Sequence, residues 1–178
     1  MSRVAVFIDG GYLDKTLEME FDRRRIDYEK FARDIGGDGE MFRVYYYYAM
    51  PFQSDPPTDE EKTRYRNKQR FVDSLGRLPL FDMRKGRLQK ISGTFKQKRV
   101  DCLFTADLVR LAWLRRIDTA VIVGGDDDFV PAVEEAKMAG VFVRLYYSTE
   151  SCSNELLQVC DECRPIDEAL VSRNELTR

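Results

Sequence analysis

Two short apolar segments constrain the fold of this chain more than any other feature. Residues 4–8 (VAVFI) and 119–123 (TAVIV) are almost wholly apolar and do not alternate with polar residues. Such a run predicts a strand that is buried on both faces, as in a parallel sheet covered by helices on each side. Each run is followed within three residues by glycine and aspartate, which favour a turn at the strand end.

Helical and strand-like segments alternate along the rest of the chain. Strands are expected at residues 3–8, 42–50, 78–83, 119–123 and 141–147, and helices at residues 12–23, 28–35, 59–75, 100–114, 128–140 and 153–159. This order predicts an α/β fold, a three-layer α/β/α sandwich with a mainly parallel central sheet. Residues 84–97 are expected to be irregular. We expect a single domain over residues 1–178, with a core of about residues 3–166 and a C-terminal helix at residues 167–178.

The composition excludes several kinds of chemistry. The 178 residues contain no histidine, so Ser-His and Cys-His nucleophile pairs and imidazole metal sites are excluded. A chain of this length folds without a structural metal, so a bound metal would serve function. The apolar runs are too short to span a membrane and no signal peptide is recognised, which predicts a cytoplasmic protein without a membrane partner. Cys160 and Cys163 form a CxxC pair without a second ligand pair, and we expect them to close a helix rather than bind metal.

Acidic residues follow both apolar strands, where active sites form in open parallel sheets. Asp9 follows the first strand, and three aspartates at residues 126–128 follow the second. Asp101 and Asp107 belong to the expected helix before the second strand. We therefore expect several carboxylates to converge on one edge of the sheet.

Each of these acids also has a purely structural interpretation. Asp9 could be a turn residue before two glycines, and Asp127 or Asp128 could cap the following helix. Asp101 could cap its own helix. Asp107 lies about 120° around that helix from Asp101, which makes it the weaker candidate. A cap needs one aspartate, however, and the second junction has three.

Converging carboxylates repel one another unless a cation lies among them. Hard divalent ions with oxygen ligands suit such a set, and Mg²⁺ or Mn²⁺ is the expected cofactor. These ions activate water and stabilise the leaving oxygen in phosphodiester hydrolysis, and that chemistry needs no histidine.

Basic residues gather between the two halves of this acidic set. Residues 77–99 contain eight lysines and arginines and one acid, Asp82. A polyanion held by its phosphates is the expected partner, although a solvated surface is the alternative. The residues expected to bind it are Arg84, Lys85, Arg87, Lys96, Lys98 and Arg99. Phe81, Phe95 and Tyr12 could stack on unpaired bases, which favours a single strand. The remaining basic candidates are the three arginines at residues 23–25 and the helix at residues 62–70.

Three motifs resemble one known family. They are VFIDGGYL at residues 6–13, FKQKRVD at residues 95–101 with Asp107 beyond it, and DTAVIVGGDDDFVPAVEEAKMAGVFV at residues 118–143. Together they resemble the NYN domains of the PIN-like nuclease superfamily, in particular the bacterial LabA-like group. The resemblance covers most of the chain, and the third motif is the most specific.

The resemblance implies a PIN-like sandwich and metal-dependent cleavage of RNA. At the matching positions it implies a catalytic metal site of Asp9, Asp101, Asp126 and Asp128, with Asp107 as a fifth member.

The chain also departs from the family pattern. Gly124 stands where the family often has serine, Asp127 replaces a small polar residue, and Tyr12 replaces a frequent asparagine. These changes keep the acids but alter the polar groups around them.

Other functions remain open at this point. A haloacid-dehalogenase-type phosphotransferase is disfavoured, because it needs a second aspartate where this chain has Gly11. A dinucleotide-binding domain is excluded, because it needs GxGxxG after the first strand and this chain has IDGGYLD there. A receiver-like acidic pocket around Mg²⁺ is a further alternative. The strongest rival to a nuclease is a non-catalytic RNA-binding or scaffolding module of the same fold. The sequence leaves homo-oligomer formation open.

Overall fold

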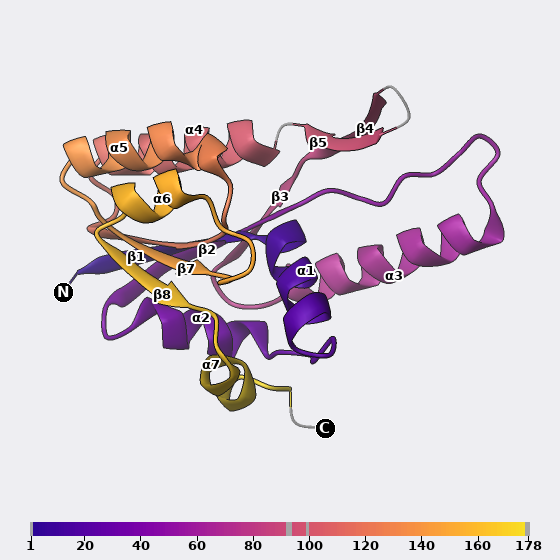
Figure 1. Cartoon of the computed structure of the whole chain (residues 1–178), viewed down its shortest axis with the longest axis horizontal. Helices are drawn as coiled ribbons and strands as arrows, with labels where there is room; N and C mark the ends of the chain where they lie inside the picture. Colours follow the sequence, from indigo (N-terminus) through magenta and orange to yellow (C-terminus); the bar gives the residue numbers. More distant parts are fainter. Residues whose placement is uncertain (1, 92–93, 99, 177–178) are drawn as a thin grey trace.

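The computed structural model describes residues 2–91, 94–98 and 100–176, and its centre is a six-stranded parallel sheet (Figure 1). The strands in sheet order are β3 (Phe81–Lys85), β2 (Glu40–Tyr48), β1 (Arg3–Asp9), β6 (Thr119–Val123), β7 (Phe142–Tyr147) and β8 (Glu162–Pro165). Every pair of neighbours in this sheet is parallel. The predicted α/β fold with a mainly parallel sheet is confirmed.

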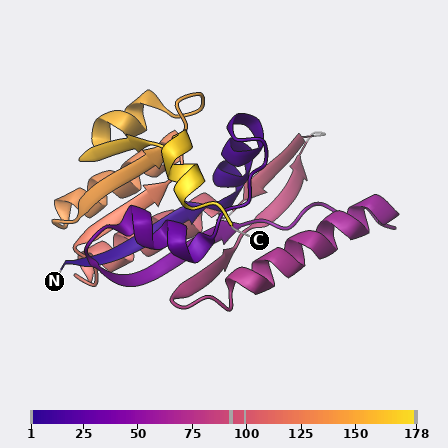
Figure 2. The same cartoon turned by 90° about the horizontal axis from the view of Figure 1, so that it is seen from below.

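Helices cover both faces of the sheet (Figures 1 and 2). One face packs against α1 (Gly10–Glu20), α2 (Tyr28–Gly36), α3 (Asp59–Leu75) and α7 (Glu168–Arg173). The other packs against α4 (Val100–Trp113), α5 (Val130–Met138) and α6 (Asn154–Val159). Within β1, Val4, Val6 and Ile8 belong to the first core and Ala5 and Phe7 to the second. The apolar run of β1 therefore has no polar alternation because both of its faces are buried.

The strand order reverses between β1 and β6. The chain begins in the middle of the sheet with β1, proceeds outward through β2 to β3, and returns through α4 to pair β6 with β1. It then proceeds outward in the other direction through β7 and β8. In open α/β sheets, the crevice at such a reversal, outside the carboxyl ends of the strands, is the usual ligand site.

Residues 87–98 differ from the expectation of irregular structure. Arg87–Ile91 and Thr94–Lys98 form an antiparallel hairpin, β4 and β5. The hairpin pairs only with itself, as a separate two-stranded sheet. Basic residues in both segments hide the apolar alternation by which strands are recognised. In both views the hairpin and the first turns of α3 extend beyond the sheet toward the same end of the molecule.

Several other elements also differ from the expected ones. α1 begins at Gly10, directly after β1, because Asp9 caps it. Residues 162–165 form the edge strand β8, which has only four residues and ends at a proline, as edge strands tolerate. α7 ends at Arg173, short of the helix expected over residues 167–178, and Glu175 then bridges to Ile26. No helix in the described part of the chain has the length and apolar character needed to cross a membrane.

Candidate metal centre

Asp9 is the last residue of β1 and the N-cap of α1. Its Oδ1 accepts a hydrogen bond from the backbone N–H of Tyr12 at 3.1 Å. Asp9 is therefore a helix cap and not the simple turn residue of the structural interpretation. The hydrogen bond also fixes the carboxylate at the strand end, beside the reversal between β1 and β6.

Asp126 occupies the equivalent place after β6. It is the N-cap of the short 3₁₀ helix Asp127–Phe129, and its Oδ1 accepts from the backbone N–H of Asp128 at 3.1 Å. Gly125, the residue before Asp126, packs closely against Tyr12 and Ser151. A Cβ at this position would lie 2.5 Å from the Tyr12 ring and 2.6 Å from the Ser151 carbonyl oxygen. Only glycine therefore allows the loop to approach α1 this closely.

Three of the four acids predicted to form the metal site line one pocket, and Asp128 is not among its lining residues. Asp9, Asp101 and Asp126 face a hollow of about 430 Å³ together with Tyr12 and Lys15. Asp101 reaches it from the first turn of α4. Asp128 adjoins this group, since ligand oxygens of Asp126, Asp127 and Asp128 lie within 4.8 Å of one another on the surface.

Burial and repulsion between the carboxylates both raise the pKa values of these acids. Burial raises the pKa of Asp9 to about 6, and repulsion from Asp101 and Asp126 adds to this, against the lowering effect of backbone hydrogen bonds. Burial, and then Asp126 and Asp128, raise the pKa of Asp101. Burial also raises the pKa of Asp126. A divalent cation among these oxygens would relieve this repulsion, so the donor set fits a hard metal ion.

Asp107 has different surroundings from the other predicted acids. It is 4% exposed, and its oxygens accept hydrogen bonds from the Tyr47 hydroxyl at 3.1 Å, Arg84 Nε at 2.8 Å and Arg110 at 2.8 Å. It is not among the residues that line the acidic pocket. Its position around α4 turns it toward Tyr47 of β2 and Arg84 of β3, and it also pairs with Arg110 of its own helix.

The predicted RNA-binding residues divide into four groups. Arg84 is engaged by Asp107 and Asp82 and stacks on the Tyr45 ring, so its charge is largely compensated. Lys85 is exposed at the end of β3. Arg87, Lys96 and Lys98 lie on the β4–β5 hairpin, whose backbone alone is described. Arg99 lies outside the described residues.

Lys15 is a pocket residue that sequence reasoning did not identify, and Tyr12, a candidate for base stacking, also has a structural role. Lys15 is exposed and lines the pocket. It lies four residues after Gly11, and residues four apart share one face of a helix, so this spacing could have identified it. The Tyr12 hydroxyl donates to the Ser151 carbonyl at 2.6 Å and accepts from the Ser148 N–H at 2.7 Å. Tyr12 therefore joins α1 to the loop after β7 and forms a fixed wall of the pocket.

The cysteines offer no comparable metal centre. All four are unbonded thiols. Cys160 is the C-cap of α6, and burial raises the pKa of its thiol to about 12, far from the thiolate that a metal requires.

The pH dependence of stability tests the electrostatics of the acidic pocket. Because the folded chain holds a proton on Asp9 up to a pH of about 6, whereas an unfolded aspartate loses it near 3.8, the stability from this group is lost as the pH rises from about 4 through 6. We expect Asp9→Asn, which retains a cap, to gain stability relative to the native chain over this interval when EDTA is present. Urea unfolding at a series of pH values measures the difference. A difference that does not vary with pH would contradict the pKa.

A solved structure of similar fold agrees with this architecture. A protein of unknown function from Vibrio parahaemolyticus superposes with a TM-score of 0.68 over 94% of this chain and 94% of its own, at 22% identity. Acinetobacter baumannii MurG gives a TM-score of 0.41 at 13% identity, over 100% of this chain and 44% of its own. No curated protein matches. The family model of the NYN domain matches residues 3–167, and the chain therefore belongs to the NYN domain family.

Proposed function

We propose that this protein is a ribonuclease that depends on Mg²⁺ or Mn²⁺ and cuts phosphodiester bonds of single-stranded RNA. The observation that carries the proposal is the convergence of Asp9, Asp101 and Asp126 on one pocket at the reversal of strand order. The NYN domain is a PIN-like nuclease family, and this membership supports the same activity.

Asp9, Asp101 and Asp126, with Asp128 beside them, would hold the metal. All four offer hard oxygen ligands. Burial, and then repulsion from neighbouring aspartates, raises the pKa values of Asp9, Asp101 and Asp126, and a bound cation would offset both effects. When bound, such an ion activates water and neutralises charge that develops on the phosphate. The caps on Asp9 and Asp126 fix one oxygen of each and so limit the rotation of both carboxylates.

The remaining lining residues would bind and orient the substrate. Lys15 is an exposed cation beside the acids, and we assign to it the phosphate next to the cleaved bond. Tyr12 is held by hydrogen bonds at both its donor and acceptor positions, so its ring would present a rigid face to a ribose or an unpaired base. Because the charge of Arg84 is compensated, Lys85 and the β4–β5 hairpin are the remaining candidates among the basic residues predicted to bind RNA.

A cleavage assay tests this proposal. Purified protein is incubated with end-labelled single-stranded RNA and Mn²⁺ or Mg²⁺, with excess EDTA in a parallel reaction and DNA of the same sequence as a control. We expect RNA cleavage that requires the metal. Metal-independent cleavage, or RNA binding without cleavage in either metal, would contradict the proposal; the latter would favour the non-catalytic RNA-binding module.

A further inference from the structure

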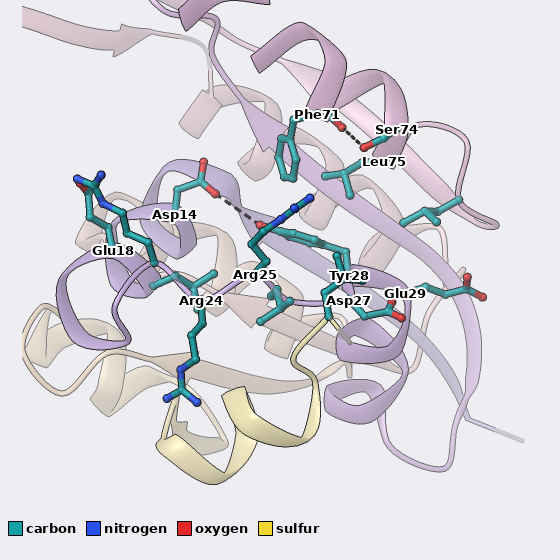
Figure 3. A pocket seen from close by; sticks show the side chains of 15 residues that line it. Asp14, Glu18, Arg24, Arg25, Asp27, Tyr28, Glu29, Phe71, Ser74 and Leu75 are labelled. Atoms are coloured by element: carbon teal, nitrogen blue, oxygen red, sulfur yellow. Dashed lines mark hydrogen bonds and ion pairs between the residues drawn. The ribbon is translucent and has the colours of Figure 1, made fainter. Parts of the chain in front are cut away.

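A second and larger pocket lies at the far end of α1. It has a volume of about 750 Å³, within the range of pockets that bind small ligands (Figure 3). The connection from α1 to α2, the start of α2, the end of α3 and Leu176 surround it. Leu17, Ile26 and Leu75 supply aliphatic walls, and Tyr28 and Phe71 supply aromatic ones. The pocket is therefore largely apolar but opens beside the three consecutive arginines at residues 23–25.

Most of the charges around this pocket are already compensated. Asp14 pairs with Lys68 at 2.7 Å, Glu29 with Arg33 at 2.8 Å, and Glu18 with Arg23. The carboxylate of Asp27 caps α2 by accepting from the Lys30 N–H at 3.0 Å. Arg24 points away from the pocket toward α7, where it pairs with Glu168.

Arg25 is the exception. Its side chain is exposed and extends over the pocket toward α3, and it forms no ion pair with any residue that the structure describes. An apolar pocket with one uncompensated guanidinium at its mouth suits a ligand that joins a flat apolar body to an anionic group. A nucleotide has this chemistry.

A third hollow along α1 borders both the acidic pocket and the large one. It has a volume of about 290 Å³ and is lined in part by Gly11, Asp14, Met50 and Lys68. It shares Gly11 with the acidic pocket and Asp14 with the large pocket. The three hollows thus follow one another along α1, and Gly11 and Leu17 are only about 9 Å apart along its axis. Lys15 lines the acidic pocket and Arg25 the large pocket, and Lys68, which pairs with Asp14, lines the hollow between them.

We propose that the large pocket holds a nucleotide of the RNA substrate away from the cleaved bond. The base enters the apolar part beside Tyr28 and Phe71, and Arg25 binds its phosphate. The strand then follows α1 past Lys68 to the acidic pocket. This inference rests on the proposed ribonuclease function and adds to it the side of the molecule on which the substrate lies.

Binding in EDTA separates this inference from catalysis. Fluorescence anisotropy with a labelled single-stranded 12-nucleotide RNA measures the dissociation constant. Arg25→Glu should weaken binding about tenfold, and Arg25→Gln should reduce the log-log salt slope by about 0.7, the value for one phosphate contact. Ser74→Glu, which places bulk and negative charge on the exposed wall formed by α3, should weaken binding similarly. Arg116→Glu is the matched control, because this exposed arginine lies in the connection between α4 and β6, at the opposite edge of the sheet.

The outcomes distinguish the two proposals. If Arg25→Glu and Ser74→Glu bind RNA as the native chain does, or if Arg116→Glu weakens binding equally, the large pocket does not hold RNA. A triple alanine variant of Lys96, Lys98 and Arg99 that loses binding while these variants keep it would assign the strand to the hairpin. Failure of the native chain to cleave RNA overturns the ribonuclease proposal instead, whatever the Arg25 variants do.

Discussion

Asp126→Asn is expected to abolish RNA cleavage while it leaves the fold intact. The substitution removes one charge from the set that would hold the metal. We expect the cleavage rate to fall about a thousandfold, which corresponds to a loss of about 4 kcal/mol of transition-state stabilisation. Asparagine is also a good N-cap, so the 3₁₀ helix after β6 should persist. Steady-state cleavage of labelled RNA at saturating Mn²⁺ measures the effect, and titration with Mn²⁺ should show weaker ion binding.

The stability of the same variant provides an independent readout. With EDTA present, Asp126→Asn should leave the free energy of unfolding unchanged or slightly increased. The substitution removes the repulsion that Asp126 exerts on the carboxylates of Asp9 and Asp101. Asp38→Asn is the matched control, an exposed aspartate in the connection from α2 to β2, and it should keep native cleavage. Native cleavage by Asp126→Asn, or unfolding of that variant, would contradict a catalytic role for Asp126.

Gly10→Ala is expected to destabilise the fold near the site. A Cβ at this position would lie 2.5 Å from Cζ and Oη of Tyr46. Tyr46 is fully buried and packs against the rings of Tyr28 and Phe71, so its ring has little room to move. Overpacking of this kind costs about 1–3 kcal/mol. Because Gly10 follows Asp9 directly, the displacement of α1 should also lower RNA cleavage.

Gly76→Ala is the control for this experiment. Gly76 has a right-handed helical conformation, with φ of −64° and ψ of −12°, and a Cβ there would lie 3.4 Å from its nearest neighbour, Cγ of Met83. We expect a change within about 1 kcal/mol, and in the stabilising direction, because alanine restricts the unfolded chain. Thermal unfolding of both variants measures the contrast. Equal midpoints would contradict the close packing of α1 on Tyr46.

The parts of the molecule that were predictable from sequence are those governed by local pattern. The buried runs of β1 and β6 and the aspartates that follow them are contiguous in the chain, so fold class and the edge of the sheet could be derived. The hairpin was missed because its apolar alternation is weak, and β8 because it is short and ends in proline. Both elements depend on pairing partners more than on their own composition.

The surroundings of individual side chains were less accessible. Asp107 is neutralised by Arg84 and hydrogen-bonded by Tyr47, 23 and 60 residues away. Tyr12 is held by Ser148 and Ser151, more than 130 residues further along. The large pocket needs α1, α3 and the C-terminal segment together. No spacing within a single segment encodes such contacts.

The pairing of β1 with β6 also determines when the acidic pocket can exist. In this pairing Val4 lies opposite Thr119 and Ile8 opposite Val123, a separation of 115 residues along the chain. Contacts of such long range close a large loop and are slow to form. During synthesis, Asp9 leaves the ribosome long before Asp126, and domains of this kind complete their fold only after the later strand is available. A nascent chain surrounded by its own messenger RNA therefore lacks the complete acidic pocket until β6 has joined the sheet.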